Sequence, residues 1–239
     1  MQEYFAKNKI NNEFILSEQD NFHIEKVMRM RSGDNIIVIY DLRKYKCTIS
    51  FKNGLKIDAV EELDINNELP IDVTLVYGIP KKDKFELVIQ KSCELGVKSI
   101  VPFMAKRSIS VLDEKNTDKK IERWNLIAKE ACEQSKRNHL VQIQKPVGLK
   151  SILEYKSDLN LVAYEDLSCQ DNTHLFSLLS GEYKSITIVV GPEGGFEKSE
   201  IDFLVQNDFV SVSLGKRILR SETAPLYLLS VIGFINERK

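Results

Sequence analysis

The spacing of apolar residues changes near residue 70, and this change divides the chain into two regions. Before it, short alternating runs predict strands at 35–40, 45–51 and 55–60, and Asn53-Gly54 predicts a hairpin turn between the last two. The sequence Ser17-Glu18-Gln19-Asp20 has the form of a capping box and predicts the start of one helix. Short strands at this spacing are typical of a small β-barrel.

Beyond residue 70 the apolar pattern alternates between strand and helix. Runs rich in β-branched residues predict strands at 73–79, 99–103, 141–144, 159–164, 186–190 and 209–214. Helical spacing predicts helices at 81–95, 117–137 (capped by Thr117), 149–155, 174–179 and 198–206, and a closing helix with Pro225 in its first turn. This alternation indicates an α/β domain with a parallel sheet and helices on both faces.

The polar segment 64–70, which ends in Pro70, marks the predicted boundary between a domain at 1–68 and a domain at 71–239. The formal net charge of −1 argues against a protein that coats nucleic acid through bulk charge, but it leaves room for a local basic patch. Five basic residues of the first domain lie close together in sequence: Arg29, Arg31, Arg43, Lys44 and Lys46. They are candidates for a patch that contacts RNA phosphates, but an ordinary solvent-exposed face would show the same pattern.

Residues 1–14 contain no apolar segment of the secretory type, so we expect a cytoplasmic protein. The longest apolar run, 224–235, is shorter than a membrane span and predicts a buried helix instead. The cysteines are scattered without a C-x-x-C pair and are expected to be reduced core thiols: Cys47, Cys93, Cys132 and Cys169. The three histidines show no metal-ligand spacing, and no metal site is predicted.

Two loops in the last quarter of the chain form the candidate site. Gly191–Gly195 follows the predicted strand 186–190, and Leu214–Ala224 follows the strand 209–214. Ligands of open α/β sheets bind at the carboxyl ends of the strands. Neither loop has the spacing of a phosphate-binding or dinucleotide-binding loop, and Glu193 and Glu197 would oppose a polyanion.

A ligand without strong negative charge, held through glycine-exposed backbone groups, fits these two loops better than a phosphate does. S-adenosylmethionine, with its sulfonium cation and its adenine, answers this description. Two ordinary strand-to-helix turns would give the same pattern, and the spacing of the glycines alone does not separate the two interpretations.

Six short motifs follow one another along the whole chain. They are His23-x-x-x-Val27-Met28-Arg29 with Gly33-Asp34, Gln90-Lys91-x-x-Glu94-Leu95-Gly96-Val97, Lys106-Arg107-Ser108, Ala131-x-Glu133-Gln134-Ser135-x-Arg137, Gly191-Pro192-Glu193-Gly194-Gly195, and Leu214-Gly215-Lys216-Arg217-Ile218-Leu219-Arg220-Ser221-Glu222-Thr223-Ala224. Together they resemble the RsmE family of bacterial methyltransferases, which act on N3 of a uridine in 16S ribosomal RNA and belong to the SPOUT superfamily. Three departures occur: Met28 replaces a leucine, Lys106 replaces a glutamate, and His139-Leu140-Val141 stands where a proline often follows the arginine.

The resemblance implies a SPOUT-type parallel sheet with a C-terminal trefoil knot, a PUA-like β-barrel at the N-terminus and a homodimer. It also implies S-adenosylmethionine as cofactor, with Leu214, Ile218 and Leu219 against the adenine unless they are plain core residues. The cofactor-binding residues carried over by motif are Tyr164, Glu165, Val190, Gly191, Pro192, Glu193, Gly194, Gly195, Leu214, Gly215, Arg217, Ile218 and Leu219.

Methylation of uracil N3 requires removal of the N3 proton, either by a base or with help from cations that stabilise the uracil anion. We expect Arg220 to stabilise that charge and Glu222 to position the base or accept the proton, unless the two form a structural ion pair. Arg137 and Glu94 are second-rank candidates for substrate contact or scaffolding. The predicted RNA contacts are Arg29, Arg31, Arg43, Lys44 and Arg137.

Two alternatives to 16S ribosomal RNA (uracil-N3) methylation stay open from the sequence. One is a SPOUT methyltransferase that acts on another RNA or on a ribose oxygen. The other is an RNA-binding module without catalytic activity. The intact loops at 191–195 and 214–224 favour a working cofactor site over a module without catalytic activity. The N-terminal motif with His23 and Arg29 favours 16S ribosomal RNA (uracil-N3) as the substrate.

Overall fold

The structure is a computed structural model that describes residues 1–239 except 53, 81–83, 108–113, 165–172 and 238–239, and the side chains of 114–116 and 173–174. It divides into two compact units. The first comprises Met1–Glu68 and Cys132–Leu140, and the second comprises Leu69–Ala131 and Val141–Lys239. The sequence pattern did not predict that the segment Cys132–Leu140 would belong to the first unit.

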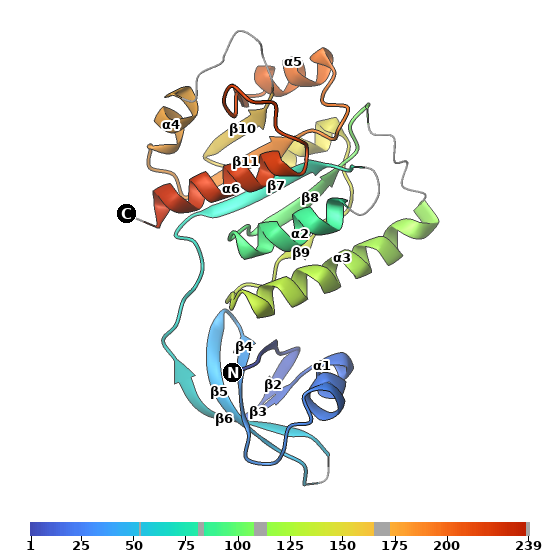
Figure 1. The fold of residues 1–239 in the computed structure, drawn as a ribbon, viewed down its shortest axis with the longest axis vertical. Coiled ribbons are helices and arrows are strands. Elements are labelled where there is room, and N and C mark those ends of the chain that lie inside the picture. The colour runs from blue at the N-terminus through green and yellow to red at the C-terminus, as the bar shows by residue number, and fades with distance from the viewer. Residues whose placement is uncertain (53, 81–83, 108–113, 165–172, 238–239) are drawn as a thin grey trace. The chain divides into compact units, whose positions relative to one another are not determined.

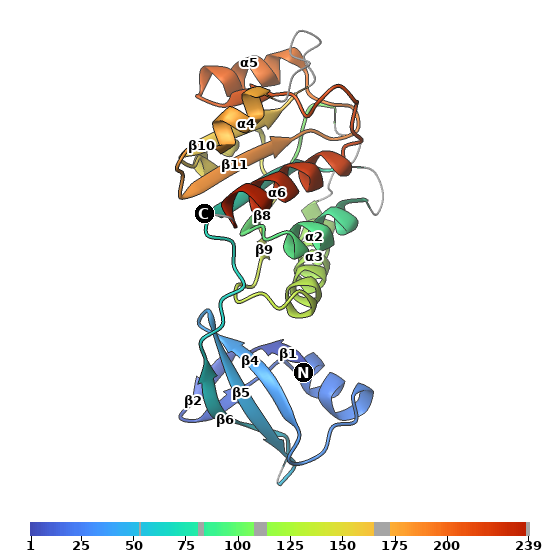
Figure 2. The ribbon, with the colours of Figure 1, turned by 60° about the vertical axis from the view of Figure 1, so that its left-hand side comes forward.

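The first unit is a curled, six-stranded half-barrel with the strand order β1-β4-β5-β6-β3-β2 (Figure 2). β1 pairs with β4 in parallel, and the other neighbours are antiparallel. Alternate side chains of the longer strands, such as Ile36, Cys47 and Ile57, fill its core together with Ile24. The strands are β1 (Glu3–Phe5), β2 (Asn8–Ile10), β3 (Glu13–Ile15), β4 (Asn35–Tyr40), β5 (Arg43–Ser50) and β6 (Lys56–Leu63).

The predicted capping box opens α1 (Glu18–Phe22), which continues as a π-helical turn over His23–Val27. The Asp20 amide donates to Ser17 Oγ at 3.1 Å, and the Ser17 amide donates to Asp20 Oδ2 at 3.3 Å, so both exposed amides are satisfied. Gly54 has the left-handed φ of +98° expected of a turn residue, while Asn53 lies outside the described residues. The strands β1, β2 and β3 were not predicted, because three residues are too few to show alternation.

Buried charges hold the segment Cys132–Leu140 in the first unit. Glu68 receives the guanidinium of Arg137, with Nε to Oε1 at 2.9 Å, and also the amide of Asn138 at 2.7 Å. Lys44 Nζ donates to Glu3 Oε2 at 3.0 Å and to the carbonyl oxygen of Lys136 at 2.7 Å. Burial alone would raise the pKa of Glu68, but the guanidinium of Arg137 and the amides of His139 and Asn138 outweigh it and lower that pKa.

The second unit contains six parallel strands in the order β12-β10-β11-β7-β8-β9 (Figure 1). The strands are β7 (Asp72–Gly78), β8 (Ser99–Phe103), β9 (Gln142–Ile143), β10 (Leu159–Ala163), β11 (Ser185–Val190) and β12 (Val210–Val212). The helices are α2 (Lys84–Glu94), α3 (Glu114–Gln134), a 3-10 helix at Leu149–Tyr155, α4 (Thr173–Leu179), α5 (Lys198–Gln206) and α6 (Thr223–Asn236).

The two faces of this sheet have separate cores. On one face Tyr77 of β7 stacks on Phe85 of α2, and Phe85 contacts Trp124 of α3. On the other face Val76 and Val189 pack with Ile201 of α5 and the 3-10 helix. Because side chains alternate along a strand, neighbouring residues such as Val76 and Tyr77 serve opposite cores. Both strand faces are buried, as expected for a parallel sheet between helices.

Two predicted helices differ from the structure in their bounds or type. α3 begins at Glu114, so Thr117 lies inside it and does not cap it, and it ends at Gln134 because Lys136 adopts a left-handed φ of +59°. The segment 149–155 forms a 3-10 helix. Among the described helices, none has the length and apolar character that crossing a membrane would require.

The described cysteines are consistent with the expected thiols. Cys47, Cys93 and Cys132 are free and buried, and Cys169 lies outside the described residues. Burial raises the pKa of Cys47 to about 12, so this side chain is a neutral thiol at physiological pH.

The Arg137–Glu68 pair gives a testable prediction for stability. We expect Arg137→Met to lower the free energy of unfolding by about 3 kcal/mol, because it leaves the Glu68 carboxylate largely buried without its cation. The matched control is Arg43→Met, since Arg43 forms a comparable pair with Glu62 at 2.8 Å but both side chains are largely exposed. Arg43→Met should destabilise the protein much less than Arg137→Met does, because water screens an exposed pair. Urea unfolding followed by far-ultraviolet circular dichroism measures both.

The same ion pair makes the stability of the protein depend on pH. Because the pKa of folded Glu68 is lowered, its contribution to stability is present above the unfolded pKa of about 4.3 and is lost as the pH falls through the folded value. The stability difference between the wild type and Arg137→Met should therefore shrink below about pH 4. Equal losses for the Arg137 and Arg43 variants at neutral pH would contradict the structural role assigned to this pair.

Candidate active site

A cavity of about 560 Å³ lies where the parallel strands end at their carboxyl edge. The register aligns Ala163 of β10 with Val190 of β11 and with Val212 of β12, and Val190 with Tyr77 of β7. The loops that follow these strands therefore begin side by side. The lining residues are Lys84, Arg107, Ala163, Tyr164, Val190, Gly191, Pro192, Glu193, Gly195, Phe196, Val212, Ser213, Leu214, Gly215, Arg217, Ile218, Leu219, Arg220, Ser221, Glu222 and Ala224.

The structure brings most of the predicted cofactor residues together around this cavity. Gly194 is the exception among the described residues, because it does not line the cavity, and Glu165 lies outside the described residues. The two predicted catalytic residues, Arg220 and Glu222, line it as well. The predicted residues found in the lining are Tyr164, Val190, Gly191, Pro192, Glu193, Gly195, Leu214, Gly215, Arg217, Ile218 and Leu219.

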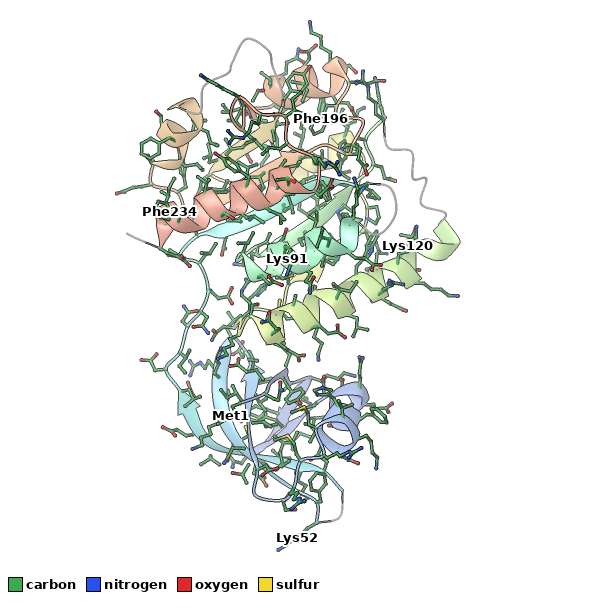
Figure 3. The ribbon with its side chains drawn as sticks, viewed as in Figure 1. Met1, Lys52, Lys91, Lys120, Phe196 and Phe234 are labelled. Atoms are coloured by element: carbon green, nitrogen blue, oxygen red, sulfur yellow. The ribbon has the colours of Figure 1, made fainter. Side chains whose placement is uncertain are left out.

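The loop after β11 lies directly against the end of β7. A Cβ atom on Gly78 would stand 2.4 Å from Pro192 Cδ and 2.5 Å from the Pro192 nitrogen, so only glycine permits this contact. The amide of Gly195, which has a φ of +65°, donates to the Pro192 carbonyl at 2.9 Å and closes the turn. Phe196, which is labelled in Figure 3, then turns its ring into the core. There it stacks with Phe103.

Glu197 serves a different purpose from the one expected for an acidic residue facing a ligand. It is the N-cap of α5 and forms a capping box with Glu200. It also pairs with Lys106 at 3.2 Å, and it is absent from the cavity lining. Glu193 is therefore the only one of these two carboxylates that faces the cavity.

The loop between β12 and α6 presents apolar side chains at the cavity. Ile218 is 79% exposed, which excludes it from the core, while Leu214 and Leu219 are half-buried. Leaving so much apolar surface of Ile218 in water is unfavourable, and an apolar ligand surface placed against it would be stabilised. Of the two interpretations of these three side chains, ligand packing fits Ile218 and plain core packing does not.

A charged cluster occupies one end of the cavity. Lys84 Nζ lies 3.2 Å from Glu222 Oε2 and 3.4 Å from Glu193 Oε1, and the Ser221 hydroxyl lies 3.2 Å from Glu222 Oε2. Partial burial alone would raise the pKa of Glu222, but hydrogen bonds from its own backbone amide and from Lys84 lower it. The hydrogen bond to Glu222 in turn raises the pKa of Lys84 and outweighs the opposing effect of burial.

The partner of Glu222 corrects one sequence-based alternative. Arg220 and Glu222 do not form an ion pair with each other, and Glu222 pairs with Lys84. The Arg220 side chain is exposed at the cavity, and within the described part of the chain it forms no ion pair. Arg220 is thus accessible to a ligand, as a charge-stabilising role requires.

Tyr77 lies beside this cluster and is fully buried. Burial raises its pKa far above the usual value, while the nearby Ser221 hydroxyl lowers it and Glu193 and Glu222 raise it further. The Tyr77 hydroxyl has no hydrogen-bond partner of acceptable geometry among the described residues, although Ser221 is close enough to influence its pKa. The phenol is neutral and is a potential donor next to two carboxylates.

Two charged residues of the cavity lining, Lys84 and Arg107, were given no role by the sequence analysis. Lys84 carries no motif signal of its own, and it reaches the site only because α2 starts at the carboxyl edge of β7. Arg107 belongs to a quoted motif, but no role was assigned to it. Its Nη1 donates to the carbonyl of Gly194 at 3.3 Å, and a Cβ on Gly194 would lie 3.1 Å from the Arg107 backbone oxygen.

The structure also corrects two of the predicted RNA contacts. Lys44 is 1% exposed and Arg137 is 2% exposed, and both are bonded to carboxylates inside the first unit. Neither charge reaches solvent, because Lys44 neutralises the buried Glu3 and Arg137 neutralises the partly buried Glu68. Arg29, Arg31 and Arg43 are exposed, and Arg43 pairs with Glu62. Glu94, a second-rank candidate, pairs with Lys91 of its own helix at 2.8 Å and does not line the cavity. Lys91 is labelled in Figure 3.

Comparison with known proteins identifies the fold and its family. A family model described as an RNA methyltransferase domain matches residues 67–233. The ribosomal RNA small subunit methyltransferase E of Bacillus subtilis (strain 168) is 40% identical over 99% of this chain and 98% of its own length. The protein of the same name from Mesomycoplasma hyopneumoniae (strain 232) is 34% identical over 96% of this chain and 98% of its own length.

Two solved structures are similar over nearly the whole chain. The ribosomal RNA small subunit methyltransferase E of Neisseria gonorrhoeae, bound to S-adenosyl methionine, has a TM-score of 0.87 and 27% identity, with 98% of each chain covered. A putative methyltransferase of Legionella pneumophila in complex with the same cofactor has a TM-score of 0.85 and 29% identity, covering 97% of this chain and 96% of that chain.

The half-barrel, the parallel sheet and the cavity loops together define a SPOUT-type RNA methyltransferase with an N-terminal barrel. Within that class, the chain belongs to the ribosomal RNA small subunit methyltransferase E (RsmE) family. The trefoil knot stays a prediction of the resemblance.

Proposed function

We propose that the protein transfers a methyl group from S-adenosylmethionine to N3 of a specific uridine in 16S ribosomal RNA of the small subunit. The observation that carries this proposal is the cavity at the carboxyl edge of the sheet, which combines a glycine-bearing backbone loop, an exposed apolar residue and an accessible arginine. Support comes from relatives of the same name that match the chain end to end.

The residues present fit S-adenosylmethionine. A cavity of about 560 Å³ falls within the range of small-molecule sites, roughly 300–1,000 Å³. The loop Gly191–Gly195 offers backbone groups, Ile218 offers apolar surface for the adenine, and Glu193 offers negative charge to a cationic ligand. When bound, the cofactor supplies an electrophilic methyl group. The protein must align that methyl with the attacking nitrogen.

Two residues of the chain are candidates for the remaining steps, which are stabilising the uracil anion and handling the N3 proton. Loss of the N3 proton leaves negative charge on the uracil carbonyl oxygens, and the exposed Arg220 guanidinium is placed to stabilise it. Glu222 is ionised at neutral pH and its pKa is lowered, so its carboxylate accepts the N3 proton or orients the base.

Substrate binding involves more than the cavity. We propose that the exposed Arg29 and Arg31 of the first unit contact RNA phosphates, which requires accessible cations.

We also propose a homodimer. Leu87 of α2 and Phe234 of α6 are large apolar side chains, 45% and 58% exposed, on two helices that pack together, and a second copy of the chain would shield them from water.

The first prediction concerns the cofactor loop. Gly78→Ala should weaken S-adenosylmethionine binding at least about tenfold, because its Cβ displaces the backbone of Pro192 and with it the Gly191–Gly195 loop. The control is Gly148→Ala, whose Cβ would meet nothing within 4 Å. Isothermal titration calorimetry with both variants measures the affinities. Unchanged affinity in Gly78→Ala would remove this loop from the cofactor site.

The second prediction identifies the modified atom. The protein is incubated with labelled S-adenosylmethionine and small ribosomal subunits from a strain that lacks the modification, and reverse transcription is then mapped. A methyl on N3 blocks the pairing edge and stops the transcriptase. Label without a stop would indicate a ribose oxygen or a non-pairing atom. Cofactor binding without any label would indicate a binding module that lacks catalytic activity.

The third prediction concerns Arg220. Arg220→Ala should lower kcat by roughly 10²–10³, the usual cost of losing one charge-stabilising donor, and should leave S-adenosylmethionine affinity nearly unchanged. Lys216→Ala is the control, because Lys216 is an exposed cation of the same loop that does not line the cavity. Single-turnover methyl transfer gives the rates. Equal effects of the two substitutions would indicate that only general positive charge matters.

A further inference from the structure

We propose that Lys84 is a positioning residue that ties the Glu193 and Glu222 carboxylates together and thereby sets the geometry of the methyl-transfer site. This inference deepens the proposed function and rests on it. The three charged groups come from the start of α2, the loop after β11 and the start of α6. The Lys84 ammonium reaches both carboxylates, at 3.2 Å and 3.4 Å, so one side chain links three segments that are distant in sequence.

The two carboxylates need a cation between them. Glu193 and Glu222 are both within reach of one ammonium group, and their side chains are 31% and 16% exposed. Like charges held this close repel each other, and partial burial weakens the screening by water. Without Lys84, the loop that carries Glu193 and the helix start that carries Glu222 would move apart, or one carboxylate would take up a proton.

The ion pairs of Lys84 differ in location from an ordinary surface ion pair. Among the ion pairs of the described residues, those of Lys84 are the ones whose three members all line the cavity. Lys98 and Asp72, by comparison, pair at the amino end of β7, at the opposite edge of the sheet. Moving Lys84 would therefore alter the position of groups that face the substrate.

Lys84 acts as a cation in this arrangement and not as the base that takes the N3 proton. Its pKa is raised, chiefly by the hydrogen bond to Glu222, and so it stays protonated. Among the described residues, the groups that face the Glu222 carboxylate are Lys84 from α2, Glu193 from the loop after β11, the Tyr77 phenol from β7 and the neighbouring Ser221. Of these, only Lys84 carries positive charge, so removing it should make Glu222 easier to protonate.

The test uses the full chain with the substitutions Lys84→Met and Lys84→Arg, and Lys98→Met as the matched control. Rates of single-turnover methyl transfer to small subunits are measured from pH 5 to 9. Lys84→Met should lower the rate at neutral pH at least tenfold and move the acid limb of the pH profile to higher pH. Lys84→Arg, which keeps the charge, should restore most of the rate and the wild-type limb, and Lys98→Met should match the wild type.

A second measurement keeps the inference independent of activity. The Glu222 carboxyl group is titrated by carbon-13 NMR in the wild type and in both Lys84 variants, with circular dichroism as the check on folding. If the Glu222 pKa rises in Lys84→Met but not in Lys84→Arg, the positioning role of Lys84 is supported. This holds even if the wild type transfers no methyl group and the proposed function fails. An unmoved Glu222 titration, or a rate loss equal at every pH, would overturn it.

Discussion

The parallel register of β7, β10, β11 and β12 is the constraint on which the site depends. Hydrogen bonding between parallel strands aligns Tyr77, Val190, Ala163 and Val212 at one edge, so the chain must leave the sheet four times at the same place. The loops crowd together there, and the contact between Gly78 and Pro192 leaves no room even for a methyl group. The cavity is the space that these crowded loops enclose.

Charge is used in two physically different ways in the two units. In the first unit Lys44 and Arg137 are buried and pair with Glu3 and the partly buried Glu68, so their role is to hold the segment Cys132–Leu140 in place. In the second unit Arg220 stays exposed beside a cluster whose two carboxylates share Lys84. A buried ion pair stabilises a fold only if both partners remain, whereas an exposed cation at a cavity remains available for a ligand.

Local patterns predicted much of the fold and nearly all of the site loops. The capping box at Ser17, the strand at 99–103 and the helix at 198–206 depend on residues that are neighbours in sequence, and they appear in the structure as predicted. The elements that were missed or shifted depend on distant partners. The three-residue strand β1 exists because it pairs with β4, and no alternation within three residues reveals that.

The amino-acid sequence by itself determined the alternation of strands and helices and the two glycine loops, because backbone freedom and apolar spacing are local properties. Only the tertiary structure decided which charges face the cavity. Lys44 and Lys84 are both lysines beside apolar strands or helices, yet one is buried against Glu3 and the other joins Glu193 to Glu222. Burial and pairing depend on groups far apart in the chain, and only the folded arrangement brings those groups together.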